Sequence, residues 1–167
     1  MKSGLWMAAQ VKAKREFSVS AALRDKGYET FVPTYIRVRR WSDRKKTSEE
    51  PLISGYVFVR TMVSHGQGLV VSTPGVVRMV GFGGKAAAID EEQIEHVKIL
   101  ANSSLRTEPW PYIKHNSRVK IICGSLSGIV GTVLQVKQNT VLVVSIEMLQ
   151  RSVAVHIDHT WVEPALV

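Results

Sequence analysis

The chain of 167 residues, 45% of them hydrophobic, is long enough to bury a core in one medium domain or two small ones. Its single cysteine, Cys123, excludes an internal disulfide framework and a zinc site built from several cysteines, and no stretch approaches the roughly 20 apolar residues of a membrane span, so we expect a cytoplasmic protein that does not enter a membrane. The formal net charge of +8 favours an anionic partner.

Strands and helices are expected to alternate in the first half. The apolar run Leu5–Val11 predicts a buried strand. Apolar residues at three- and four-residue spacings predict a helix over Lys14–Lys26, which Gly27 ends. Strands are then expected over residues 29–32, 35–41 and 52–62, with a polar loop over residues 42–50.

A short helix or turn is expected over residues 66–72, before Thr73-Pro74-Gly75 breaks the chain. A strand over residues 76–82 follows, and Gly83-Gly84 turns it. The clearest helix signal covers Asp90–Ala101, where Asp90 is a plausible N-cap and Ile89 can pack against Ile94. The first 103 residues therefore predict one α+β domain, an antiparallel sheet flanked by helices.

Residues 104–113 predict a linker, because Glu108-Pro109-Trp110-Pro111 contains two prolines that disfavour helix in the residues before them. From residue 114 to residue 167 the texture changes to short β-branched strands separated by glycines. These strands are expected over residues 119–122, 129–136, 140–146 and 153–157. The pattern predicts a second domain, a small all-β barrel. Its many β-branched residues disfavour helix, so we expect it to stay a barrel.

A glycine-rich motif follows Arg118-Val119-Lys120-Ile121 at the first turn of this expected barrel. Its spaced glycines suit a turn with unusual backbone angles, and its apolar residues supply contacts between two strands. The segment resembles a KOW motif, which implies an SH3-like barrel; the alternative is a glycine-rich turn in a barrel of another kind. The motif residues are Gly124, Leu126, Gly128, Gly131 and Val133.

The first half is similar to the N-terminal (NGN) domain of the NusG family of transcription elongation and antitermination factors. The resemblance rests on Trp6, on the run from Glu50 to Val59, and on the run from Thr73 to Gly81. Within that family, Arg40–Arg44 and Leu149–Val155 look more like specialised antiterminators of the UpxY type than the housekeeping factor.

The resemblance implies that the first domain binds bacterial RNA polymerase at the clamp, through an apolar surface. Carried onto this chain, the contacts would come from Trp6, Ile53, Tyr56 and Phe58. Ile53 and Ser54 stand where relatives often have Phe and Pro, so the apolar contact is smaller. The alternative is that these residues are plain core.

Six cations occur within ten residues, interleaved with two aromatic residues. Three of them lie between Tyr35 and Trp41, and three follow Trp41. Such a segment places several positive charges beside phosphates while an aromatic ring stacks on an unpaired base. We therefore predict contact with DNA or RNA in the elongation complex; the alternative is a solvated hairpin. The predicted nucleic-acid-binding residues are Arg37, Arg39, Arg40, Trp41, Arg44, Lys45, Lys46 and Arg78.

The resemblance implies a non-enzymatic monomer without a cofactor that suppresses pausing and termination. Its barrel would recruit a ribosomal small-subunit protein, the Rho terminator or RNA. The alternative is a ribosome-associated or RNA-binding KOW protein. Catalytic and metal-binding patterns are incomplete. The segment Gly81–Lys85 lacks the first glycine and the Ser or Thr of a Walker phosphate loop. Cys123 has no evident base to make it a nucleophile, and His156 and His159 should lie on opposite faces of a strand, where they cannot share a metal ion.

Overall fold

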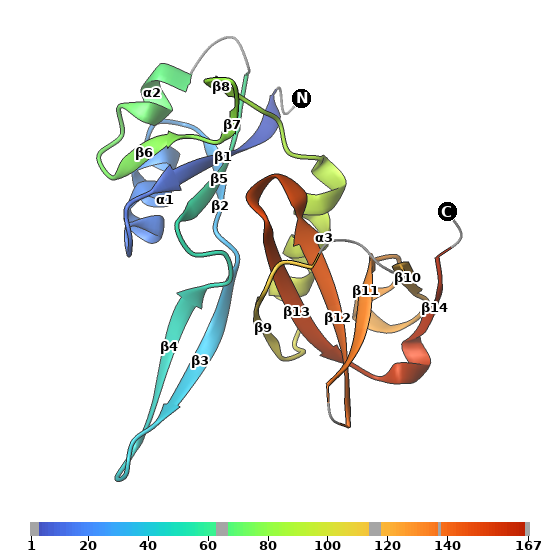
Figure 1. Ribbon diagram of the computed structural model, residues 1–167. Helices are drawn as coiled ribbons and strands as arrows, with labels where there is room; N and C mark the ends of the chain where they lie inside the picture. Colours follow the sequence, from blue (N-terminus) through green and yellow to red (C-terminus); the bar gives the residue numbers. More distant parts are fainter. Residues whose placement is uncertain (1–3, 63–66, 114–117, 137, 166–167) are drawn as a thin grey trace. The chain divides into compact units, whose positions relative to one another are not determined.

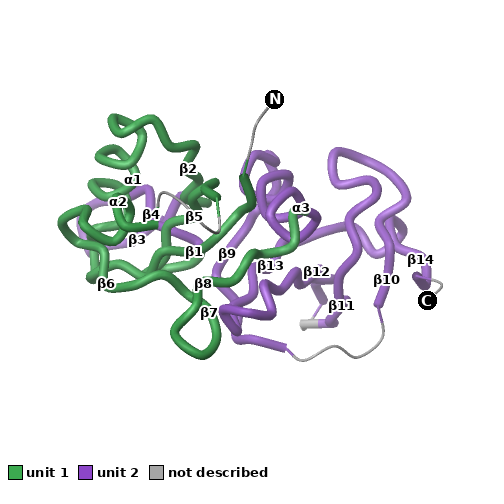
Figure 2. Tube along the Cα trace, turned by 90° about the horizontal axis from the view of Figure 1, so that it is seen from above, with its two compact units in different colours: residues 1–33, 53–91 green, residues 34–52, 92–167 purple. Residues whose placement is uncertain are grey.

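The computed structural model of the chain describes residues 4–62, 67–113, 118–136 and 138–165. Two compact units make up the chain, one formed by residues 1–33 and 53–91 and the other by residues 34–52 and 92–167 (Figure 2). The predicted domain boundaries at residues 103 and 114 stay a prediction, and residues 114–117 lie outside the described residues.

The first unit contains a four-stranded antiparallel sheet of strand order β2-β5-β1-β6 and two helices (Figure 1). The strands are β1 (Leu5–Val11), β2 (Glu29–Phe31), β5 (Tyr56–Thr61) and β6 (Val76–Met79), and the helices are α1 (Glu16–Asp25) and α2 (Gln67–Val71). The predicted elements near these positions are confirmed, with two differences. The strand expected over residues 52–62 begins only at Tyr56. The strand expected over residues 76–82 is divided into β6 and a separate strand, β7 (Gly81–Phe82).

Both helices pack on one face of this sheet. Strand side chains alternate between faces, so Ala9, Val57 and Val59 point to the same side and meet Val19 of α1 and Val70 of α2 in one buried cluster. Burying these apolar side chains removes them from water and holds the helices to the strands.

A buried carboxylate fixes the loop that leads into β5. Glu16, in the first turn of α1, is almost completely buried, and its Oε1 accepts a hydrogen bond of 2.8 Å from the backbone N–H of Gly55. In the same loop, Leu52 and Ile53 are buried although they lie outside any strand. The apolar character of these residues therefore reflects a buried loop instead of a strand.

The chain also forms two antiparallel hairpins (Figure 1). The second unit contains the hairpin of β3 (Thr34–Arg40) with β4 (Lys45–Pro51), and the first unit contains the hairpin of β7 (Gly81–Phe82) with β8 (Lys85–Ala86). The expectation of a polar loop over residues 42–50 is wrong, because most of it is strand β4. The sequence of β4 contains no apolar alternation, so the pattern that predicts strands was absent there.

The C-terminal part has helix α3 (Glu91–Asn102) followed by a six-stranded antiparallel sheet of order β14-β10-β11-β12-β13-β9. The strands are β9 (Thr107–Trp110), β10 (Arg118–Ile121), β11 (Val130–Val136), β12 (Asn139–Ile146), β13 (Arg151–Ile157) and β14 (Val162–Pro164), with single 3-10 turns η1 (Gly124–Leu126), η2 (Glu147–Leu149) and η3 (His159–Trp161). The mixed fold class with antiparallel sheets is confirmed. The sheet also contains two unexpected strands, β9 and β14.

Strand β9 lies within the linker expected over residues 104–113, where no strand was expected. Thr107–Trp110 pairs with β13 along its whole length, so these residues belong to the sheet. Among the described residues, no helix is long and apolar enough to cross a membrane.

Candidate nucleic-acid interface

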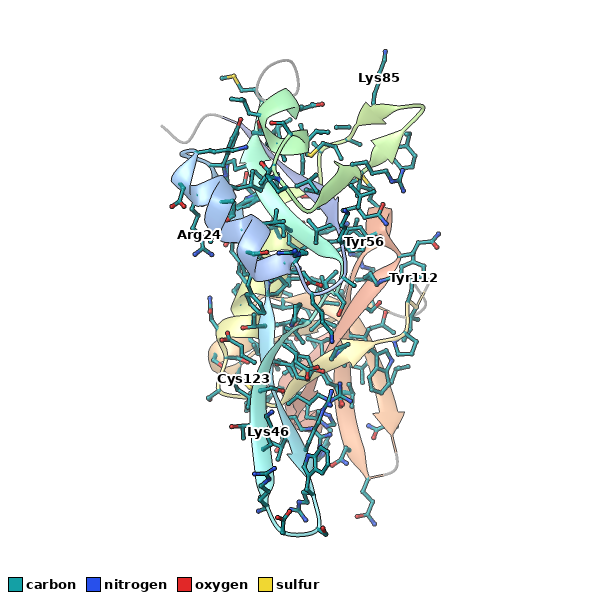
Figure 3. All side chains as sticks on the ribbon, turned by 90° about the vertical axis from the view of Figure 1, so that its left-hand side faces the viewer. Arg24, Lys46, Tyr56, Lys85, Tyr112 and Cys123 are labelled. Atoms are coloured by element: carbon teal, nitrogen blue, oxygen red, sulfur yellow. The ribbon has the colours of Figure 1, made fainter. Side chains whose placement is uncertain are left out.

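The β3–β4 hairpin holds all of the predicted nucleic-acid-binding residues except Arg78. Its strands pair in continuous register from Thr34 opposite Pro51 to Arg40 opposite Lys45. A tight turn closes the tip, where the backbone N–H of Trp41 donates to the carbonyl of Arg44 over 2.8 Å. Six cations are therefore brought onto one narrow ribbon, with Lys46 on its second strand (Figure 3).

The register divides these cations between two faces, because residues directly opposite each other in an antiparallel pair point to the same side. Arg37, Arg39 and Lys46 share one face with Tyr35 and Glu50. Arg40 and Lys45 share the other face with two exposed apolar side chains, Ile36 at 63% and Val38 at 55% exposure. The hairpin thus presents a charged face and a mixed face, a division that residue order alone did not reveal.

Glu50 partly neutralises the positive charge of the face that carries Arg37 and Arg39. Its carboxylate lies 3.1 Å from Nη1 of Arg37 and 3.5 Å from Nη2 of Arg39. The hydrogen bond from Arg37 lowers the pKa of Glu50, against the opposing effect of its partial desolvation. Two of the six cations are therefore engaged within the hairpin when Glu50 is ionised.

Tyr35 lies at the base of the same face and is half-buried. Burial raises the pKa of its phenol, and the neighbouring Glu50 carboxylate raises it further. Tyr35 therefore stays neutral and is less accessible to a ligand than the tip of the hairpin.

The tip combines an exposed aromatic ring with unshielded positive charge. Trp41 is 62% exposed, and Arg40, Arg44 and Lys45 around it are exposed as well. An indole face in water can stack on a nucleobase, and neighbouring cations can bind the flanking phosphates. Among the predicted residues, this group has the geometry that best fits single-stranded nucleic acid.

The predicted polymerase-binding residues lie mostly in the interior. Trp6 and Ile53 are each 1% exposed and Phe58 is 0% exposed, while Tyr56 is half-buried. The register places Trp6, Tyr56 and Phe58 on one face of the first sheet, opposite the face that carries α1 and α2. In this conformation, Tyr56 is the member of the predicted set that a partner can reach.

Trp6 has a clear structural role on that face. The guanidinium carbon of Arg60 lies 4.9 Å from the centre of its ring, in cation–π geometry. Arg60 also forms ion pairs with Glu29, at 3.2 Å, and with Glu91. The indole is thus covered by an arginine that two carboxylates hold in place.

A second basic group escaped the sequence-based prediction. Lys12, Lys14 and Arg15 are exposed in the loop between β1 and α1, and the backbone N–H of Lys12 donates to the carbonyl of Gly75 over 2.8 Å. Arg78, which was predicted, lies on β6 of the same unit; it is exposed and donates to the side chain of Gln10 over 2.8 Å. The sequence did contain a signal for the group of Lys12, Lys14 and Arg15: positive charges before the start of a helix oppose its dipole, so they need a reason other than helix stability.

The glycines of the C-terminal motif are explained by backbone angles and close approaches. Gly124, at the start of η1, and Gly128 have φ angles of +77° and +93°, which favour glycine. Gly131 lies on β11, where a Cβ atom would meet the carbonyl oxygen of Val143 at 2.6 Å. Leu126 is buried and Val133 half-buried, so this motif builds the turn and its core.

The incomplete catalytic patterns gain no support from the fold. Among the described residues, no three His, Cys, Asp or Glu side chains come together as metal ligands. Gly81–Lys85 forms the β7–β8 hairpin, and Lys85 extends from its tip (Figure 3). Cys123 is exposed, and His156 contacts Glu108.

Comparison with known proteins relates the chain to one family. The family model NusG, described as transcription termination factor nusG, matches residues 4–98. No curated protein matches the chain significantly. The solved structure "Domain interaction in Thermotoga maritima NusG" is similar over 98% of both chains, with 22% identity and a TM-score of 0.58. The "MjSpt4:Spt5 complex conformation B" matches over 98% of both chains with 15% identity and a TM-score of 0.33.

Proposed function

The chain belongs to the NusG family of transcription factors, and from this premise we propose that it binds bacterial RNA polymerase during elongation, contacts nucleic acid and suppresses pausing and termination. The observation that carries the proposal is the β3–β4 hairpin. Its tip presents Trp41 with Arg40, Arg44 and Lys45, all exposed, in an arrangement suited to an unpaired strand.

The proposed contact with the polymerase clamp uses the first unit. Tyr56 is the accessible member of the predicted apolar set, and it lies on the sheet face that is free of α1 and α2. The exposed cations Lys12, Lys14 and Arg15 give the same unit a second surface suited to phosphates. Each of the two surfaces can then contact a different component of the elongation complex.

The C-terminal sheet is proposed to be a KOW-type domain that recruits a further partner, such as a small-subunit ribosomal protein, Rho or RNA. The tight turn at Gly124–Gly128 and the close strand approach at Gly131 support this assignment. We further propose that the protein acts in the cytoplasm as a monomer, without a cofactor and without enzymatic activity. A specialised role of the UpxY type would restrict its action to particular operons.

The direct test is transcription by purified cognate polymerase on templates that contain a pause site and a terminator. The protein should shorten the pause and increase read-through. Longer pauses or increased termination would contradict the proposed sign, and no effect on several templates would show that the chain does not act alone on the polymerase.

A matched pair of variants separates the hairpin from general charge. The double variant Arg40→Glu with Lys45→Glu reverses a cross-strand pair at the tip, and it should abolish the effect on pausing. The double variant Lys85→Glu with Lys120→Glu reverses two exposed charges outside the β3–β4 hairpin, so it changes the net charge equally, and it should retain the effect. Equal loss in both variants would mean that net charge, and not the hairpin, carries the activity.

The C-terminal motif also favours a second candidate, a ribosome-associated or RNA-binding protein. Its glycine-rich turn is a feature of the sheet alone and makes no use of the hairpin. Affinity purification from cells distinguishes the two. Recovery of ribosomal subunits without polymerase would favour the second candidate, whereas recovery of polymerase favours the first.

A further inference from the structure

The segment that joins α3 to the C-terminal sheet is docked on the sheet edge. We call residues 106–113 the strap. Its strand β9 pairs with β13 from Thr107 opposite Val155 to Trp110 opposite Ser152. The pairing continues one step further, since the backbone N–H of His156 donates to the carbonyl of Arg106 over 3.0 Å. The strap therefore occupies the edge of β13 that β12 leaves open.

The position of Pro109 limits the strap to an edge. Hydrogen-bonded and non-hydrogen-bonded pairs alternate in an antiparallel ladder. Counting from the bond between His156 and Arg106 places Pro109, opposite Val153, at a non-bonded position. The N–H that proline lacks would point away from β13, so the docked strap loses no bond to the sheet and offers no donor there to a further strand.

Side chains of the strap cover an apolar face of the sheet. Trp110 and Ile113 pack against a cluster of Val141, Val143 and Ala154. On the same side, the Nε2 atom of His156 lies 2.6 Å from Oε1 of Glu108, and both side chains remain partly exposed. The strap is thus held by one strand edge, one apolar contact and one polar contact.

Docking of the strap also shortens the connection to α3. Four residue steps separate Asn102, at the end of α3, from Arg106, which gives a maximum span of about 14 Å. Sixteen steps separate Asn102 from Arg118, at the start of β10, which gives a maximum span of about 56 Å. Release of the strap would therefore lengthen the available connection about fourfold.

We infer that the strap is a releasable latch with two states. Docked, it covers the edge of β13 and the Val141, Val143 and Ala154 face, and it holds the connection to α3 short. Released, it uncovers that edge and that face and gives the C-terminal sheet a long connection. Any strand that pairs with β13 must first displace the strap. The inference does not depend on the proposed function.

Hydrogen exchange measured by NMR on the full chain tests whether the strap opens by itself. The reporter is the amide of His156, which donates to the strap, and the reference is the amide of Leu142 on β12, between β11 and β13. His156 should exchange faster than Leu142 in the native chain. Trp110→Ala should accelerate exchange at His156 about tenfold and leave Leu142 unchanged. Trp41→Ala, which removes an indole outside the strap, should change neither rate.

A disulfide supplies the opposite perturbation. Thr107 and Val155 form a non-bonded cross-strand pair, so Thr107→Cys with Val155→Cys, in a Cys123→Ser background, can lock the strap. Under oxidation, exchange at His156 should fall to the rate at Leu142, and reduction should restore it. The inference is overturned if His156 and Leu142 exchange together in the native chain and accelerate together in Trp110→Ala, because the strap then opens only with the whole sheet.

The length of the connection is tested separately with spin labels at Glu95→Cys, on α3, and Glu163→Cys, on β14, again with Cys123→Ser. Trp110→Ala should broaden the distribution of distances between the labels, whereas Trp41→Ala should not. An unchanged distribution in Trp110→Ala, despite faster exchange at His156, would overturn the change in connection length.

Discussion

The β3–β4 hairpin and the C-terminal sheet are both antiparallel, but they differ in what stabilises them. The sheet buries apolar side chains such as Leu142, Val153 and Val155. The hairpin exposes most of its side chains, including Val38 and Trp41, and its cross-strand contacts are ionic. A two-stranded ribbon in water is only marginally stable by itself. Side chains on the hairpin are therefore available for a ligand, whereas those in the sheet maintain the fold.

The largest expected effect is on the stability of the sheet. Leu142→Ala removes a fully buried side chain from β12, and it should lower the free energy of unfolding by about 2–5 kcal/mol through lost burial and the cavity left behind. Val38→Ala, on the exposed hairpin, should change it by less than about 0.5 kcal/mol. Urea unfolding followed by circular dichroism measures both, and equal effects would remove the distinction between the two regions.

A smaller loss of stability is expected from Gly131→Ala. The added Cβ would lie 2.6 Å from the carbonyl oxygen of Val143, so β11 and β12 must separate, which should cost about 1–3 kcal/mol. Gly68→Ala is the control, since its added Cβ has no neighbour within 4 Å and it lies in α2. That change should stabilise the protein by about 0.5–1 kcal/mol. A neutral Gly131→Ala in thermal unfolding would contradict the close approach.

On the hairpin, the expected effect is on binding. Trp41→Ala should weaken binding to single-stranded DNA by about 1–3 kcal/mol, the cost of losing one base-stacking contact, while unfolding changes little. Phe82→Ala removes another exposed ring, at the β7–β8 hairpin, and should leave the affinity unchanged. Fluorescence anisotropy with a labelled oligonucleotide tests both variants. If Trp41→Ala binds the oligonucleotide as tightly as the native chain, stacking on Trp41 is excluded.

The smallest effect concerns the charge balance of the hairpin. Glu50→Gln removes the carboxylate that pairs with Arg37 and Arg39, so DNA binding should tighten and its dependence on salt should steepen by about one unit of slope for each cation that gains a phosphate. Glu49→Gln is the control, because Glu49 lies on the opposite face and accepts a hydrogen bond from Thr34.

The ionisation of Glu50 also predicts how DNA affinity changes with pH. The hydrogen bond from Arg37 lowers the pKa of Glu50, so its carboxylate stays ionised to a lower pH than an ordinary glutamate. The ionised form stabilises the hairpin above the ordinary pKa, and this contribution is lost as pH falls through the lowered one. DNA affinity should therefore rise in that acidic range for the native chain, and the part of the rise due to Glu50 should be missing in Glu50→Gln.

Sequence periodicity was informative wherever one face of an element is buried. It located β1, α1, α3 and the strands β10–β13, because their apolar residues recur with the period of a strand or a helix. It failed for β4, whose residues Lys45–Pro51 have no buried face, and it extended β5 over the buried loop at Leu52 and Ile53. Burial and strand formation are separate properties: Leu52 and Ile53 are buried outside any strand, whereas the alternating Ile36 and Val38 of β3 are exposed.

Local sequence by itself determined the family resemblance, the glycine-rich turn and the cations of the hairpin, because each depends on residue types at short spacing. Tertiary structure decided which cations share a face, that Glu50 engages Arg37 and Arg39, that Trp6, Ile53 and Phe58 are buried, and that part of the expected linker pairs with β13. These outcomes depend on strand register and long-range packing, which join residues far apart in the chain and leave no local periodic signal.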